Sequence, residues 1–266
     1  MRLSASQFQF LIDQLRQAPQ QGFQQACIQL NKLDLLAWLN QQQHTTRGYW
    51  KNKHRQQVAF IGAAKSVLDL EQLQVVSEQL DKSNNQLRFY GGIAFSQQSA
   101  QWPSFPQHRF ILPRFEIRCD GEYTRLFVNA NFQQQPELEY QRIKQAFAAL
   151  RPSRPLPENA TKALSRQDQP NAQQWQKLVD EVTSDEFQQH TAKVVLSRQT
   201  SIQLNGEINP FTLLQQWQQK EPKCYSFLFQ FDGINSFLGC SPERLYSREG
   251  SQLVSEELDG TAPRSV

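Results

Sequence analysis

The sequence has few of the residues that usually build metal and redox sites. Its four cysteines form no C-x-x-C pair, and its four histidines show neither H-x-x-H nor H-E-x-x-H spacing. These absences argue against a disulfide framework and against a zinc site, and they favour reduced thiols in a cytoplasmic protein. We expect ordinary packing or surface roles for Cys27, Cys119, Cys224, Cys240, His44, His54, His108 and His190.

Long apolar runs and a strong charge of one sign are also missing. No run approaches the length of a membrane span, and the first residues lack the apolar core and cleavage site of a signal peptide. The net charge is only +3, from 28 basic and 25 acidic residues that are scattered along the chain. We therefore expect neither membrane nor nucleic-acid partners. Without a G-x-G-x-x-G or P-loop motif, nucleotide binding by these familiar routes is also unsupported.

Hydrophobic and aromatic residues are plentiful, and they alternate between helical and strand patterns. The chain has 266 residues, 18 Phe and 5 Trp, enough for a sizeable core. Apolar spacing predicts helices at 6–16, 33–39, 70–80, 137–150, 175–182 and 209–217, and strands at 57–63, 87–95, 109–119, 123–131, 193–204, 224–231 and 234–239. Asp120-Gly121 and Asp232-Gly233 favour tight hairpin turns. The pattern predicts an α+β fold with antiparallel strands.

A proline-rich and polar segment at 151–171 is the best candidate for a linker. It would separate a variable α+β region at 1–150 from a second region at 172–266. A crossing between two layers of one continuous domain would have the same composition, so both arrangements stay open.

Three short segments could carry chemistry, although each also has an ordinary interpretation. Lys193 stands at the start of a predicted apolar strand, where a lysine is usually a solvated strand end. Glu243 follows Ser241-Pro242, and by itself it could simply stabilise a turn or pair with Arg244. Gly260-Thr261 could be a plain turn, or a close backbone approach to a ligand.

The order of these segments distinguishes the alternatives. K-V-V-L-S-R at 193–198, F-L-G-C-S-P-E-R-L at 237–245 and S-E-E-L-D-G-T at 255–261 together resemble motifs of the chorismate-utilising enzyme family. The resemblance implies that Lys193 is a general base and Glu243 a general acid. It places Leu258, Gly260 and Thr261 on a loop that contacts the substrate. The implied fold has antiparallel sheets packed face to face, with helices outside.

Further upstream, V-A-F-I-G-A, F-Y-G-G-I-A-F and L-P-R-F-E (112–116) are similar to the menaquinone-specific isochorismate synthases. The implied reaction converts chorismate to isochorismate: a base activates water for addition to the ring, and an acid assists loss of a hydroxyl. A siderophore-type isochorismate synthase and anthranilate synthase component I are alternatives within the family. An alternative of another class is a truncated scaffold without catalytic activity.

The chain departs from the family pattern in two respects. The resemblance implies Mg²⁺ as cofactor, but the family's metal ligands lie beyond the third motif, so we expect no metal ligands before Val266. We accordingly expect an incomplete chain that is inactive by itself, whose exposed strand edges favour a homodimer or a swapped assembly. Asp259 stands where most relatives carry alanine, and its charge should repel a dianionic substrate.

Overall fold

The computed structural model describes residues 3–81, 86–95, 102, 104–133, 135–191 and 193–256. The chain divides into two compact units. Unit 1 combines Met1–Pro157 with Pro210–Val266, and unit 2 is Glu158–Asn209. Residues from 210 onward therefore group with the N-terminal region and not with residues 172–209. The predicted regions 1–150, 151–171 and 172–266 divide the chain differently.

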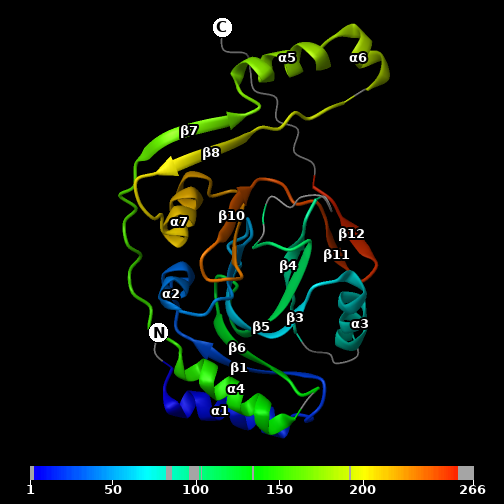
Figure 1. Ribbon diagram of the computed structural model, residues 1–266. Coiled ribbons are helices and arrows are strands. Elements are labelled where there is room, and N and C mark those ends of the chain that lie inside the picture. Colours follow the sequence, from blue (N-terminus) through cyan, green and yellow to red (C-terminus); the bar gives the residue numbers. More distant parts are fainter. Residues whose placement is uncertain are drawn as a thin grey trace. The chain divides into compact units, whose positions relative to one another are not determined.

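Unit 1 is built around one eight-stranded antiparallel sheet (Figure 1). Its strand order is β1-β6-β5-β3-β2-β9-β10, and β4 pairs with β5 outside this path. The late strands β9 and β10 enter the sheet because β9 pairs with β2, where Gly48 lies opposite Phe229. The strands are β1 (Phe23–Leu30), β2 (Arg47–Lys51), β3 (Gln57–Val67), β4 (Tyr90–Ile93), β5 (His108–Cys119), β6 (Thr124–Asn131), β9 (Tyr225–Gln230) and β10 (Ser236–Ser241).

Amphipathic helices cover one face of this sheet and form the main core with it. Helix α1 buries Leu11, Ile12 and Leu15, and it starts with a capping box between Ser4 and Gln7 that satisfies backbone donors of its first turn. Helices α1 and α4 lie side by side (Figure 1). The ring of Phe8 from α1 stacks on that of Phe147 from α4, with 3.7 Å between the ring centroids. The helices of unit 1 are α1 (Ala5–Gln17), α2 (Leu35–Gln41), α3 (Leu70–Asp81), α4 (Pro136–Ala148) and α7 (Pro210–Lys220).

The other face of the sheet carries a row of aromatic residues around one buried carboxylate. The strand register aligns Phe127, Glu116, Phe60, Gly48, Phe229 and Phe237 across the sheet. Gly48 leaves room for the Phe60 ring, because a Cβ at this position would lie 2.0 Å from it. The ring of Tyr90 from β4 stacks on Phe60 at 4.9 Å.

Unit 2 contains a two-stranded sheet and two helices. Strands β7 (Ala163–Gln169) and β8 (Gln199–Leu204) are antiparallel, and α5 (Ala172–Val182) and α6 (Asp185–His190) lie between them in the sequence. The prediction that a strand starts at Lys193 is wrong. The ladder ends at the pair Gln169–Gln199, where Pro170 follows without an N–H to continue it. Strand β7 also occupies the second half of the proline-rich segment, which is therefore not all linker.

The predicted α+β class with antiparallel sheets is confirmed, as are the predicted helices and both hairpins. In the hairpins, Gly121 and Gly233 adopt φ of 99° and 80°. The Asp120 and Asp232 carboxylates accept backbone hydrogen bonds within the same turns. A short ribbon of β11 (Ser247–Glu249) and β12 (Gln252–Val254) ends the described chain. Across the described ranges, no helix is long and apolar enough to cross a membrane.

Candidate functional site

Glu243 lies in unit 1, on the turn that follows the edge strand β10. Pro242 restricts the backbone of this turn, and the Ser241 hydroxyl donates a hydrogen bond of 3.0 Å to the Glu243 carbonyl oxygen. The Glu243 side chain is exposed. The turn therefore has a defined backbone and an exposed Glu243 carboxyl group.

Lys193 lies in unit 2, in the segment between α6 and β8, and its side chain is also exposed. The following residues Val194 and Val195 are exposed as well, at 45% and 81%. Lys193 and Glu243 belong to different units, and each is described here within its own unit. Within unit 2 the Lys193 side chain is exposed, and within unit 1 the Glu243 side chain is exposed.

The three predicted substrate-binding residues, Leu258, Gly260 and Thr261, lie outside the described residues, as does Asp259. The described chain reaches Glu256, directly before this segment.

Glu256 is at the centre of a group of charged and aromatic side chains that sequence reasoning missed. We call Glu256, Lys53, Tyr225 and Arg244 the Glu256 cluster. The Tyr225 hydroxyl donates to Glu256 Oε1 at 2.9 Å, Lys53 Nζ lies 3.1 Å from Oε2, and Arg244 Nη2 lies 2.9 Å from Oε1. The hydrogen bonds from Tyr225 and Lys53 lower the pKa of Glu256. The carboxylate is therefore held ionised by donors from three parts of the chain.

The cluster left little signal in the sequence because its members are far apart. Lys53 and Glu256 are separated by 203 positions, and only the antiparallel pairing of β2 with β9 brings Lys53 near Tyr225. The one available signal was the S-E-E run at 255–257, which places carboxylates next to the predicted binding loop L-D-G-T.

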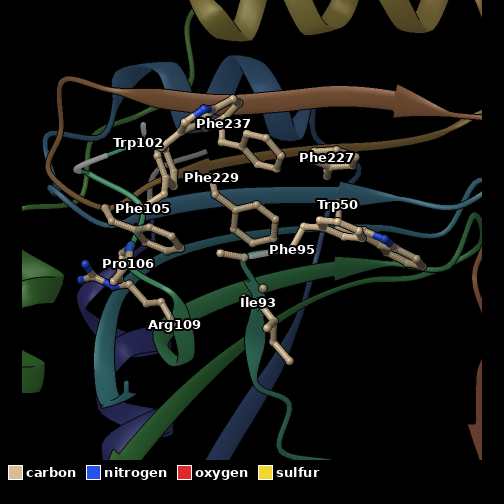
Figure 2. Close-up of a pocket in the computed structure, with 14 residues that line it drawn as sticks. Trp50, Ile93, Phe95, Trp102, Phe105, Pro106, Arg109, Phe227, Phe229 and Phe237 are labelled. Carbon is tan, nitrogen blue, oxygen red and sulfur yellow. The ribbon is translucent and has the colours of Figure 1, made fainter. Parts of the chain in front are cut away.

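An aromatic cavity of about 670 Å³ opens on the face of the sheet opposite the main core (Figure 2). Arg109 is its charged lining residue, and the guanidinium lies 4.4 Å from the centroid of the Phe231 ring. Burial lowers the pKa of Arg109, and nearby Asp232 opposes this shift. Such a cavity can accept a flat apolar group that carries an anion. Its aromatic walls are Trp50, Phe95, Trp102, Phe105, Phe227, Phe229, Phe231 and Phe237.

Trp50 connects the cavity with the Glu256 cluster, since its ring centroid lies 6.4 Å from that of Tyr225. Close by on the same face, Glu116 is fully buried and forms an ion pair with Arg118. Burial raises the pKa of Glu116, while the positive charge of Arg118 opposes the shift.

The donors needed for a metal are not gathered in the part of the chain that the structure describes. Among the described residues, no group of at least three His, Cys, Asp or Glu side chains could hold a metal ion. The described residues therefore do not fit a magnesium site by themselves.

Comparisons with known proteins relate this arrangement to one family. A family profile described as "Chorismate binding enzyme" matches residues 10–266. The chain is 31% identical to isochorismate synthase MenF of Escherichia coli (strain K12) over 233 residues, which cover 86% of this chain and 51% of that protein. It is 28% identical to MenF of Haemophilus influenzae, with 88% and 51% covered.

A solved structure gives the same relationship. The menaquinone-specific isochorismate synthase MenF from Escherichia coli superposes with a TM-score of 0.72 at 25% identity, covering 91% of this chain and 56% of that one. The chain thus spans about half the length of the curated relatives it matches.

Proposed function

Because the chain belongs to the family of chorismate-binding enzymes, we propose that it binds chorismate and supplies the acid–base residues for its conversion to isochorismate. The observation that carries this proposal is the extent of the match. The family profile covers residues 10–266, and the similarity to the E. coli enzyme covers 86% of the chain. Both Lys193 and Glu243 lie inside the region that the profile matches.

The reaction needs a proton to be removed on one side and supplied on the other. Water adds to one ring carbon of chorismate, and a hydroxyl group leaves from another as water, so that the product is an isomer. We assign the first proton to the Lys193 amine, acting as base, and the second to the Glu243 carboxyl group, acting as acid. The exposed carboxylate on the Ser241–Glu243 turn and the exposed amine in unit 2 are both accessible to a ligand.

The pathway is a second part of the proposal. The MenF proteins that the chain resembles are named as isochorismate synthases, and the solved one as menaquinone-specific. We infer a menaquinone-type enzyme for this reason. Magnesium belongs to the proposal only as a family property, and we assign it no step, because the described residues offer no ligand set.

Chorismate binding and product analysis on the purified chain test the proposal. Calorimetry should show saturable binding of chorismate. Any product formed in the presence of magnesium should be isochorismate, both with and without added ammonia. An amino-substituted product that depends on ammonia would move the chain to the nitrogen-using branch of the family. A folded chain that neither binds nor converts chorismate would contradict the proposal.

A further inference from the structure

Arg244 directly follows the proposed acid Glu243, but its guanidinium is paired with a different carboxylate. Arg244 Nη2 lies 2.9 Å from Glu256 Oε1. Glu243 itself forms no ion pair among the described residues. The sequence alone allows a pair between the two neighbours Glu243 and Arg244. In the structure this cation is directed to Glu256 instead.

Two further hydrogen bonds hold the backbone on both sides of Arg244. The Ser241 hydroxyl donates to the Glu243 carbonyl oxygen at 3.0 Å, and the Ser255 hydroxyl donates to the Leu245 carbonyl oxygen at 3.0 Å. Neither bond uses the Glu243 carboxyl group. The backbone of this turn is therefore held in place while the carboxyl group of the proposed acid stays without a cationic partner.

The other partners of Glu256 belong to the sheet and keep its carboxylate in position. The Tyr225 hydroxyl donates to Oε1 at 2.9 Å, and Lys53 Nζ lies 3.1 Å from Oε2. Tyr225, the first residue of β9, is 7% exposed, and Lys53 follows β2, which pairs with β9. The Arg244 guanidinium also lies 6.0 Å from the centroid of the Tyr225 ring. A network of this kind restricts its members more than a single surface ion pair does.

We propose that Glu256 is a positioning residue for the acid step, which holds the Arg244 guanidinium so that this cation does not pair with Glu243. A general acid has to carry a proton, and a cation beside a carboxyl group favours the ionised form that has lost it. By binding Arg244, Glu256 lets the proposed acid keep its proton. This inference rests on the proposed function, because it takes Glu243 as the acid.

The titration of the Glu243 carboxyl group tests this role without any ligand. Carboxyl carbon signals of ¹³C-labelled glutamate report the titration, and the variant Glu243→Gln identifies the signal of this residue by its loss. Glu256→Gln should move the Glu243 midpoint to lower pH by about half a pH unit, because the released Arg244 can pair with Glu243. Glu256→Asp keeps a carboxylate and should stay close to wild type. An unchanged midpoint in Glu256→Gln would overturn the proposal.

A second background shows whether the effect passes through the arginine. In Arg244→Gln, the further change Glu256→Gln should leave the Glu243 midpoint nearly unchanged, because no guanidinium remains to be released. The same lowering in both backgrounds would make Glu256 an ordinary neighbouring charge and would overturn the proposal. The matched control is Glu249→Gln, which removes the same charge from an exposed residue of β11 and should leave the midpoint near that of wild type. Circular dichroism checks that every variant is folded.

The dependence of the rate on pH connects the titration with the reaction. In a preparation that forms isochorismate, the rate should fall at lower pH in Glu256→Gln than in wild type, about threefold at a pH above the midpoint. A shifted midpoint with an unshifted rate profile would remove Glu256 from the acid step. If wild type bound no chorismate, the proposed function would fail, and the titration would still decide whether Glu256 keeps Arg244 from Glu243.

Discussion

Arg114 of β5 and Glu139 of α4 form a buried, two-pronged ion pair. Arg114 Nη1 lies 2.5 Å from Glu139 Oε1 and Nη2 lies 3.3 Å from Oε2, with both side chains at most 6% exposed. The same carboxylate accepts the Asn131 N–H at 2.6 Å, and the guanidinium donates to the Asn129 carbonyl at 2.8 Å. This pair joins helix α4 to two strands, and it explains one of the charged residues in the L-P-R-F-E segment.

Arg114→Met should lower the free energy of unfolding by about 3 kcal/mol, because it removes the buried cation and leaves Glu139 only the half-exposed Arg142, at 3.8 Å, as an ion-pair partner. Urea denaturation followed by circular dichroism measures this change. Arg16→Met is the comparison, since the Arg16–Asp13 pair is 3.7 Å long and about half exposed. That change should cost less than about 1 kcal/mol. Equal effects of the two substitutions would contradict a special role for the buried pair.

Substitution by alanine should affect the stability of the protein at Gly91 but not at Gly92. A Cβ at Gly91 would lie 1.8 Å from the Arg109 carbonyl oxygen, a backbone atom of the paired strand β5, whereas a Cβ at Gly92 would meet none of the described residues within 4 Å. Gly91→Ala should therefore destabilise the protein by about 2 kcal/mol or more. Gly92→Ala should leave the unfolding midpoint nearly unchanged. A tolerated Gly91→Ala would show that β4 does not pair this closely with β5.

Short sequence patterns correctly predicted the helices and hairpin turns that depend on residues close together in the chain. The α1 face of Leu11, Ile12 and Leu15 and the Asp-Gly hairpins follow from periodicity and turn chemistry. Strand β1 was missed, because F-Q-Q-A-C-I-Q-L has glutamines where an apolar alternation would be expected. Of the strand predicted at 193–204, the part at 199–204 formed as β8, and the apolar residues before it pair with no described strand.

The candidate site was harder to predict for a physical reason. Motif resemblance identified Lys193 and Glu243, but a motif contains no information on which distant side chains surround it. The Glu256 cluster depends on strand pairing between β2 and β9, a contact of high sequence separation that one sequence does not specify. The aromatic cavity likewise gathers side chains from β2, β9 and β10, each of which alone resembles ordinary core.

In a preparation of the chain that forms isochorismate, substitution of the proposed acid and base should reduce product formation much more than chorismate binding. Glu243→Gln keeps the size of the side chain and removes the proton donor, and Lys193→Gln removes the amine. Each should lower kcat at least about a hundredfold, the usual contribution of a positioned acid or base, with a smaller change in KM. The measurement is product formation by chromatography, with Glu249→Gln as the control. A full rate in either variant would remove that residue from the mechanism.

The Glu256 cluster should weaken as the solution becomes acidic. Because hydrogen bonds from Tyr225 and Lys53 lower the pKa of Glu256 in the folded chain, its contribution to stability is present above the ordinary pKa of a glutamate. This contribution is lost as the pH falls through the lowered folded value, when the carboxylate gains a proton and its pairs with Lys53 and Arg244 break. Burial is the main reason why the pKa of Tyr225 is raised. Its hydroxyl therefore stays protonated as the solution becomes acidic and cannot cause the change.

Protection factors for the amides of residues 247–256 measure this effect, because they correct each exchange rate for the pH dependence of the unstructured chain. In wild type they should fall between neutral and acidic pH, relative to the amides of β3. In Glu256→Gln they should already be low at neutral pH and should change little on acidification, since no carboxylate remains at this position to gain a proton. A matching loss of protection in both proteins would assign the acid sensitivity to other carboxylates.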